Sequence, residues 1–242
     1  MNDIAKNIEI VHKKIAEACL RANRNPSDVT LVAISKRKPA GAIVAAAEAG
    51  LRHFGENRVE EANDKLPEVQ SMTGLPLIWH MVGHIQSRKA RDVVAHFDIV
   101  HSLDSLKLAN KISSLVEDSG KGTIDVLLQI NISGEASKSG FHATNWTTDT
   151  IIREQLWQNV KHMLGLPGLR IRGLMTMAPI VADVELARPV FADLMALRDA
   201  LSESFDISLL ELSMGMTDDY PVAIEEGATM VRVGRAIFGE RE

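Results

Sequence analysis

Residues 29–36 read VTLVAISK, a short apolar run that ends at Lys36. A run of this length, rich in branched side chains and followed by Pro39, predicts a buried β-strand. Lys36 then stands where the strand leaves the core, at the mouth of a pocket. Arg37 and Lys38 follow it, and nearby positive charges would disfavour the charged form of its amine. An uncharged lysine amine is what Schiff-base chemistry requires, although a solvated lysine at a strand end fits this position equally well.

Strand and helix patterns alternate along the rest of the chain. Apolar runs predict strands at residues 29–36, 51–55, 77–82, 98–101, 123–132, 169–175, 209–213 and 230–233. Helical patterns lie at residues 4–23, 40–49, 58–65, 86–96, 105–118, 147–163, 184–204 and 219–226. We expect the helix at 58–65 to stop before Pro67, and Thr147 or Thr148 to cap the helix at 147–163.

The alternation of strands and helices favours a parallel sheet with right-handed crossovers. Eight such units that close on themselves form a (β/α)8 barrel. We therefore predict an α/β protein, a single TIM barrel domain over residues 1–242 with an extra N-terminal helix. An open, doubly wound sheet is the alternative, but it would need fewer strands and a glycine-rich turn in the place where Lys36 stands.

The composition is that of an ordinary globular protein. Of 242 residues, 45% are hydrophobic and 24% are charged, and the net charge of −5 gives no general attraction for nucleic acid or an anionic membrane. No apolar run reaches the length of a membrane span, and residues 1–6 lack the apolar core of a signal peptide. Cys19 is the single cysteine, so no internal disulfide can form. We therefore expect a cytoplasmic protein.

Polar and cationic residues gather where the predicted strands end. In a barrel of this kind the chemistry lies at the carboxyl ends of the strands, and the last two loops often bind phosphate. Gly215 would let the backbone approach an anion, and Ser213 and Thr217 offer hydroxyl donors. Gly234 and Arg235 open a segment that could begin a short helix with its N–H groups toward a phosphate. Together with the strand-end lysine, these loops describe a pocket for an aldehyde that carries a phosphate, although such glycine turns also occur without a ligand.

Arg232 lies between Val231 and Val233 in the last predicted strand. The alternation of side chains along a strand places it on the opposite face from both valines, pointing into the barrel. A buried arginine must meet a ligand or a carboxylate. If the ligand is pyridoxal 5'-phosphate (PLP), an arginine at its ring nitrogen keeps that nitrogen unprotonated and weakens the cofactor as an electron sink. A structural ion pair with Asp or Glu is the alternative.

A series of segments, which follow one another in order along nearly the whole chain, closely resembles the pyridoxal phosphate homeostasis protein family. These segments are Val32–Pro39, His53–Asn57, Trp79–Gln86, Gln129–Ile132, Lys138–Gly140, Gly173–Met177, Leu212–Met216, Met230–Gly234 and Ile237–Gly239. The chain departs from the residues usual in the family at Arg58, Arg88, Thr217 and Arg235. These departures affect the rim and the phosphate contacts that the resemblance implies, and they leave Lys36 untouched.

The resemblance implies a fold type III barrel, like the N-terminal barrel of alanine racemase, that holds PLP as an internal aldimine on Lys36. It places Asn57 near the cofactor ring, Met175 among the cofactor-binding residues, and Arg232 at the ring nitrogen. It surrounds the phosphate with Ser213, Gly215, Thr217, Gly234 and Arg235. The family has no established catalytic turnover, so the resemblance implies a carrier or regulator in vitamin B6 homeostasis rather than an enzyme. The implied partners are PLP and, as recipients, apo forms of PLP-dependent enzymes.

A PLP-dependent amino-acid racemase is the first alternative. Racemisation needs one base on each face of the bound substrate. In the racemases that the chain resembles, the second base is a tyrosine reached through a C-terminal β-domain. We expect that domain to be absent, because the chain ends soon after the last predicted strand, and we therefore also expect a monomer. The single tyrosine, Tyr220, is expected to be a surface residue.

A Schiff-base aldolase without a cofactor is the second alternative. It shares the barrel and the lysine, but it leaves Arg232 without a role.

Three further residues, His80, His84 and Lys138, are candidates for a functional role. His80 and His84 are four residues apart, but on a strand this spacing separates them by ~13 Å, so we expect no metal site. Lys138 lies in a long loop, residues 133–146. It is either a solvated lysine or a residue that helps to pass the cofactor to a partner.

Overall fold

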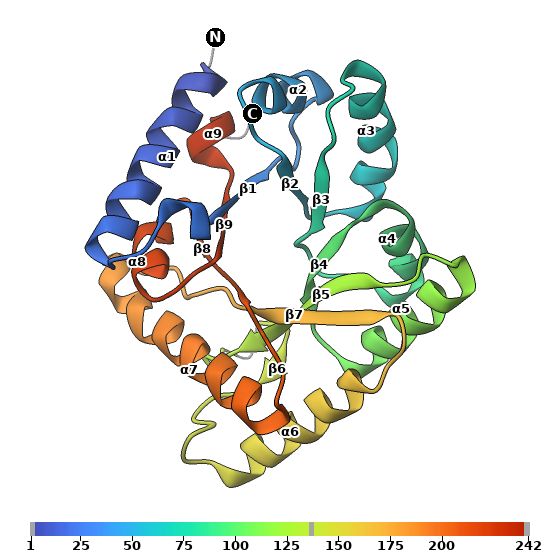
Figure 1. Ribbon diagram of the computed structural model, residues 1–242, viewed down its shortest axis with the longest axis vertical. Helices are drawn as coiled ribbons and strands as arrows, with labels where there is room; N and C mark the ends of the chain where they lie inside the picture. Colours follow the sequence, from blue (N-terminus) through green and yellow to red (C-terminus); the bar gives the residue numbers. More distant parts are fainter. Residues whose placement is uncertain (1–2, 136–137, 240–242) are drawn as a thin grey trace.

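The computed structural model describes residues 3–135 and 138–239. Over these residues, parallel strands close into a barrel in the order β4-β3-β2-β1-β9-β8-β7-β5, and β5 pairs with β4 to complete the ring (Figure 1). The barrel strands are β1 (Thr30–Ile34), β2 (His53–Glu56), β3 (Ile78–Met81), β4 (Ile99–Leu103), β5 (Ile124–Asn131), β7 (Leu169–Met175), β8 (Glu211–Met216) and β9 (Met230–Val233). The predicted (β/α)8 barrel is confirmed, and the open sheet is excluded.

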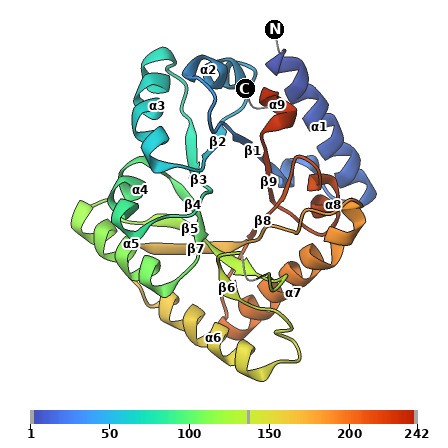
Figure 2. The same ribbon diagram turned by 180° about the vertical axis from the view of Figure 1, so that it is seen from behind.

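Helices form a ring around the barrel in both views (Figures 1 and 2). In the described part of the chain they are α1 (Ile4–Arg21), α2 (Ala40–Glu48), α3 (Val59–Met72), α4 (Ala90–His96), α5 (Leu106–Ser119), α6 (Thr150–Leu164), α7 (Arg188–Phe205), α8 (Tyr220–Glu225) and α9 (Arg235–Phe238). Short 3-10 turns lie at Pro26–Asp28, Ser87–Lys89 and Val184–Ala187. None of the described helices is both long enough and apolar enough to cross a membrane.

Helix α1 is the predicted extra N-terminal helix. It packs against α8 and α9, the last two helices of the described chain. The Asn7 side chain donates a hydrogen bond to the Ile237 carbonyl oxygen at 2.9 Å, and Arg24 donates to the Ile224 carbonyl oxygen at 2.7 Å. The beginning of the chain is thereby held against its end.

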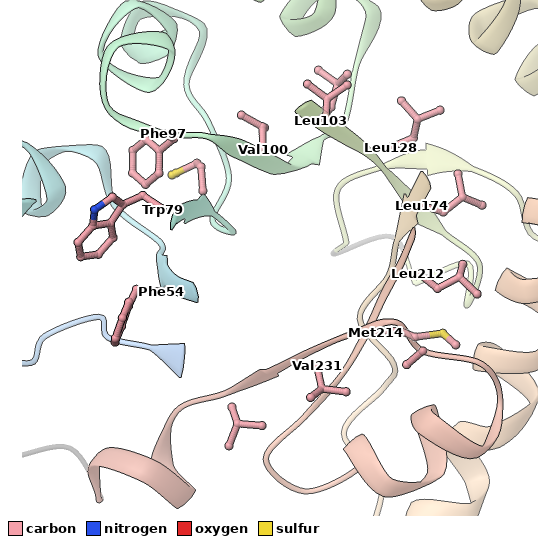
Figure 3. Close-up of a cluster of buried hydrophobic side chains, with 14 of the residues drawn as sticks. Phe54, Trp79, Phe97, Val100, Leu103, Leu128, Leu174, Leu212, Met214 and Val231 are labelled. Atoms are coloured by element: carbon pink, nitrogen blue, oxygen red, sulfur yellow. The ribbon is translucent and has the colours of Figure 1, made fainter. Parts of the chain in front are cut away.

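The barrel strands are buried on both faces. Their outward side chains pack against the helices and form most of the core, and Figure 3 shows this outer core with Phe54, Trp79, Val100, Leu212 and Val231 on five different strands. A second, small apolar cluster lies inside the barrel and consists of Val32, Leu127, Met175 and Met230. This division into two cores follows from the alternation of side chains along each strand.

Helix α3 continues through Pro67, so the predicted stop before this proline is wrong. Proline lacks the N–H group that would donate to the carbonyl of Asn63, at a cost of about 3 kcal/mol in a helix interior. Leu66 and Val69, on either side of the proline, are both buried in the core. The packing of this face of the helix outweighs the lost hydrogen bond.

Helix α6 begins at Thr150, and its N-cap is Asp149 rather than Thr147 or Thr148 as predicted. The Asp149 carboxylate accepts hydrogen bonds from the backbone N–H groups of Ile151 and Ile152. A carboxylate also interacts favourably with the positive end of the helix dipole, which a threonine hydroxyl does not. The charged cap therefore determines where the helix starts.

Two local elements differ from the sequence prediction. The helix predicted at residues 86–96 is divided into a 3-10 turn, Ser87–Lys89, and helix α4. The loop at residues 133–146 contains a short strand that was not predicted, β6 (Phe141–His142), which pairs in parallel with the end of β5. A strand of two residues is too short to show a periodic pattern, so the sequence carries no signal for it.

Replacing Leu212 with alanine tests the outer core. Leu212 is fully buried, so the substitution removes apolar contacts and leaves a cavity, and we expect the free energy of unfolding to fall by about 2–5 kcal/mol. Leu210, two positions earlier, is 59% exposed, and Leu210→Ala should change that free energy by about 0.5 kcal/mol or less. Urea denaturation measures both variants. Equal losses in the two would contradict the placement of Leu212 in the core.

Candidate functional site

The order of the strands brings the predicted site residues to one end of the barrel. Strands β2, β1, β9, β8 and β7 are consecutive neighbours in the ring. Asn57 follows β2, Lys36 follows β1, Gly234 follows β9 and Thr217 follows β8. Because these strands are parallel, their carboxyl ends open at the same mouth of the barrel. The structure thus gathers residues that are far apart in the sequence.

Close backbone contacts join neighbouring loops at this mouth. A Cβ atom on Gly83, after β3, would lie 2.1 Å from the carbonyl oxygen of Asn57, so no side chain fits at position 83. A Cβ atom on Gly234 would lie 3.3 Å from the carbonyl oxygen of Ile34, the last residue of β1. These contacts fix the loops that carry Asn57 and Lys36 against their neighbours.

A buried polar cluster anchors the backbone immediately before Lys36. The Nζ atom of Lys65 donates to the Ser35 carbonyl oxygen at 3.0 Å and to Glu56 Oε1 at 2.9 Å, and Ser35 Oγ donates to the same carboxylate oxygen at 2.6 Å. Ser35 and Glu56 are fully buried. Burial raises the pKa of Glu56, while the Ser35 hydroxyl and the Lys65 charge oppose that rise. The half-buried Lys36 therefore begins from a fixed backbone position.

The backbone immediately after Lys36 is held by the same group of residues. The Arg37 N–H group donates to the Glu61 carboxylate, and Lys65 forms an ion pair with that carboxylate. Arg37 has a φ angle of 59°, in the left-handed region that non-glycine residues rarely adopt. This tight turn and the Ser35 contacts fix the backbone on both sides of Lys36.

Arg232 lies inside the barrel, as strand alternation predicts, and is only 5% exposed. Its Nη1 atom donates to Ser213 Oγ at 2.5 Å, and its Nη2 atom donates to the Thr176 carbonyl oxygen at 2.8 Å. Among the residues that the structure describes, no carboxylate forms an ion pair with it. Burial lowers its pKa to about 10, and Asp219 opposes that shift, so the guanidinium keeps its charge at neutral pH.

Three histidines inside the barrel lead to Arg232, and sequence reasoning missed this arrangement. His53 Nδ1 lies 3.0 Å from His80 Nε2, His80 Nδ1 lies 2.7 Å from His101 Nε2, and His101 Nδ1 lies 2.8 Å from Ser213 Oγ. His80 and His101 are fully buried, and His53 is half-buried. We call His53, His80, His101 and Ser213 the histidine chain.

The buried rings of the histidine chain are neutral. Burial lowers the pKa of His80 to about 3, and the neighbouring His53 adds to the effect. Burial also lowers the pKa of His101 far below its usual value, with further contributions from His80 and Arg232. Burial lowers the pKa of His53, against the opposing charges of Asp98 and Glu211. A positive charge on His101 would be repelled by the nearby guanidinium of Arg232.

The sequence contains a signal that could have revealed the histidine chain. His80 lies between Trp79 and Met81, which are both part of the outer core. The alternation that placed Arg232 inside the barrel therefore places His80 there too. His84, four residues after His80, is exposed, and its Nδ1 atom lies within hydrogen-bond distance of Asp104 Oδ2, at 2.9 Å. In the described part of the chain, no group of three or more metal-ligating side chains is arranged to hold a metal ion.

Ser213 and Met175 lie deeper than the predicted phosphate loops. The Ser213 hydroxyl is fully buried between His101 and Arg232, so in this structure it contacts those residues rather than facing the loop. Met175 is 1% exposed and packs in the small inner apolar cluster, at the carboxyl end of β7. Both residues border the interior below the mouth.

The loops after β8 and β9 contact each other directly. The Gly234 N–H group donates to Thr217 Oγ1 at 3.4 Å, and the exposed Arg235 forms an ion pair with Asp218 at 2.5 Å. Gly215 has a φ angle of 89°, and a Cβ atom there would lie 2.8 Å from the Cα atom of Tyr220. The two loops that the sequence assigned to phosphate thus contact each other, and the predicted short helix, α9, follows the second of them.

Tyr220 is buried, so the expectation of a surface tyrosine is wrong. It begins helix α8, and the glycine at position 215 lets the preceding turn pack directly against it. Its hydroxyl has no hydrogen-bond partner among the described residues. Burial raises its pKa to about 12, so the phenol stays protonated at neutral pH. A buried, protonated phenol is poorly suited to act as the second base of a racemase.

Comparison with known proteins defines the class of this barrel. The family model described as "Alanine racemase, N-terminal domain" matches residues 6–242. The pyridoxal phosphate homeostasis protein of Pseudomonas aeruginosa is 43% identical over 242 residues, which is all of this chain and 97% of that protein. The protein of the same name from Escherichia coli K12 is 40% identical, over all of this chain and 98% of that protein. The chain belongs to the pyridoxal phosphate homeostasis protein family.

Solved structures agree with this assignment. The PipY protein of Synechococcus elongatus, solved with PLP bound, is 36% identical and covers 98% of this chain and all of that chain, with a TM-score of 0.79. An alanine racemase of Clostridium difficile is 13% identical, and its TM-score is 0.71 over 99% of this chain and 57% of that chain. At that identity the likeness concerns the fold alone.

Acid titration tests the neutral state of the buried histidines. The pKa of His80 is about 3 in the folded protein against 6.5 for an ordinary histidine, so the unfolded chain binds the proton more strongly. Stability is therefore unaffected by this group above pH 6.5, and it falls by about 1 kcal/mol per pH unit as the pH drops from 6.5 toward 3. We expect a shallower fall in His80→Gln, measured by urea denaturation at each pH.

The exposed His12 on α1 provides the matched control, as His12→Gln makes the same substitution outside the barrel. If the free energy of unfolding falls with the same slope in the wild type and in His80→Gln between pH 6.5 and 3, then His80 takes up a proton in the folded protein as readily as in the unfolded chain. This result would contradict the expectation.

Proposed function

We propose that this protein binds PLP at the mouth of the barrel, with Lys36 as the covalent attachment point, and that it takes part in PLP homeostasis. The observation that carries the proposal is that Lys36, on its fixed turn, follows the strand next to the one that carries Arg232, a buried cation with no ion-paired carboxylate among the described residues. Two basic side chains on adjacent strands, at and below the same mouth of the barrel, suit an anionic ligand. The homeostasis relatives and the PLP-bound PipY support PLP as that ligand.

The residues at the mouth fit the parts of this cofactor. When bound, PLP supplies an aldehyde that condenses with a lysine amine. Lys36 would provide that amine, and Arg232 would direct its charge toward the ring nitrogen and keep it unprotonated. Asn57 and Met175 would lie near the ring.

The phosphate of the cofactor would lie against the joined loops after β8 and β9. Thr217 offers a hydroxyl there, and Gly215 and Gly234 leave the backbone accessible because they carry no side chain. Arg235, which already pairs with Asp218 on the same surface, would contribute positive charge at the rim. Ser213 would act from below, through its hydrogen bond to Arg232.

The proposed role is that of a carrier rather than a racemase. A racemase needs a second base above the site, and the single tyrosine of this chain is buried in α8 with a raised pKa. Transfer of PLP to apo-enzymes by a cytoplasmic monomer is the form of this role that we propose. Lys138, paired with Glu135 and close to Ser133, lies in the loop after β5 and is the residue we assign to that transfer.

Borohydride reduction tests the attachment point. We expect the wild type incubated with PLP to show a visible absorbance band that reduction abolishes, and peptide mass analysis to find a pyridoxyl group on Lys36. Lys36→Ala should lose both the band and the adduct, because the amine is gone. Lys38→Ala, two residues away, is the matched control and should keep both. A protein that stays colourless and unmodified in excess PLP would overturn the proposed function.

Deuterium exchange tests the absence of racemase turnover. We expect the α-hydrogen of L-alanine in heavy water to exchange no faster with the PLP-loaded protein than with Lys36→Ala and free PLP, because no second base is positioned. Proton NMR follows the loss of the α-hydrogen signal. Exchange at about 1 s⁻¹ or faster, a rate ordinary for enzymes, would contradict the carrier role.

A further inference from the structure

The histidine chain crosses the interior of the barrel. His53, His80 and His101 lie on the adjacent strands β2, β3 and β4, whereas Ser213 lies on β8, which is not a neighbour of β4 in the ring. The 2.8 Å contact between His101 Nδ1 and Ser213 Oγ therefore spans the interior. A continuous row of hydrogen bonds runs from the half-buried His53, at the amino end of β2, to the guanidinium of Arg232.

The donors in this row can be assigned from one fixed end. Arginine has no acceptor, so Arg232 must donate to Ser213 Oγ. If the Ser213 hydroxyl donates a hydrogen bond to His101 Nδ1, then His101 carries its hydrogen on Nε2. Through Nε2–H, His101 donates a hydrogen bond to His80 Nδ1. His80 in turn carries its hydrogen on Nε2 and donates to His53 Nδ1. Each contact then contains one hydrogen, and all three rings are the neutral Nε2–H tautomer.

The opposite arrangement is disfavoured by the charge of Arg232. It would turn every ring to the Nδ1–H tautomer, and His101 would then donate to Ser213 Oγ beside the donating guanidinium. Ser213 Oγ could accept both hydrogen bonds, but the dipoles of the row would face the cation with their positive ends. In a buried site such charge–dipole terms are weakly screened. The guanidinium thus selects one direction for the whole row.

We propose that His53, His80 and His101 are positioning residues for Arg232, and that they form a one-way hydrogen-bond chain of Nε2–H tautomers which fixes the guanidinium through Ser213 without neutralising its charge. This inference rests on the proposed function, which it deepens by naming what holds Arg232 against the ring nitrogen of the cofactor. A carboxylate partner would fix the guanidinium equally well but would cancel its charge. A chain of neutral rings fixes it and leaves the charge available to the ligand.

The first test uses the cofactor-free protein, so it does not depend on PLP. In long-range proton–nitrogen NMR spectra of protein labelled with ¹⁵N-histidine, we expect His53, His80 and His101 to show hydrogen on Nε2 and an unprotonated Nδ1 at pH 7. In Arg232→Gln, which keeps a donor but removes the charge, we expect His101 to become a mixture of tautomers. Hydrogen on Nδ1 of His80 or His101 in the wild type, or an unchanged spectrum in Arg232→Gln, would overturn the proposal.

The second test measures the effect of the histidine chain on the bound cofactor. His101→Leu removes the link to Ser213 and leaves Lys36 in place, so we expect it to bind PLP but to shift the pH midpoint of the visible band by about half a unit or more. His101→Gln can donate and accept, and it should restore the midpoint toward that of the wild type. His12→Gln, outside the barrel, should leave it unchanged. Coincident midpoints for the wild type and a folded His101→Leu would overturn the positioning role.

Two outcomes keep the inference separate from the proposed function. If His101→Leu does not fold, Ser213→Ala breaks the same link by the loss of one oxygen atom, and it is held to the same expected shift. If the wild type shows the Nε2–H tautomers but does not bind PLP, the histidine chain is confirmed as a structural feature only. The proposed function and the positioning role are then both wrong.

Discussion

Side chains in the barrel strands alternate between two buried environments, and this constraint determines both the core and the site. Residues such as Val231 and Leu212 face the helices and need only be apolar. Residues such as Arg232 and His80 face the interior, where water is excluded and every polar group needs a partner. The polar side chains of the interior are accordingly joined by hydrogen bonds, in a row from His53 to Arg232.

The electrostatics of the interior distinguish this barrel from one held by ion pairs. Lys65 near the mouth is matched by two carboxylates, Glu56 and Glu61. Arg232 has neutral contacts instead, a hydroxyl and a carbonyl oxygen. One cation thus holds the backbone around Lys36, and the other has no ion-paired carboxylate among the described residues. The difference between the two is visible only when their partners are known.

The sequence predicted the features that depend on period and order. Lys36 at a strand end, Arg232 inside the barrel and the closed (β/α)8 fold all follow from runs and alternation, and each is where it was expected. Features that depend on contacts between distant residues were missed or wrong. Tyr220 is buried because Gly215 allows a close approach, and the sequence shows that glycine without showing what it faces. The contact of the Ser213 hydroxyl with His101 was missed, because the two residues are more than a hundred positions apart in the sequence.

The pairing of β1 with β9 has a consequence for how the protein is made. Val32 is the partner of Arg232, so nearly the whole described chain lies between two strands that are neighbours in the ring. During synthesis β1 emerges early, and one of its edges stays open until β9 has left the ribosome, which exposes it to wrong pairing. The strand that ends this exposure is also the one that carries Arg232 and leads into Gly234. A nascent chain therefore contains Lys36 long before Arg232 and Gly234 have been synthesised. The barrel closes, and the site at its mouth is completed, in a single late step.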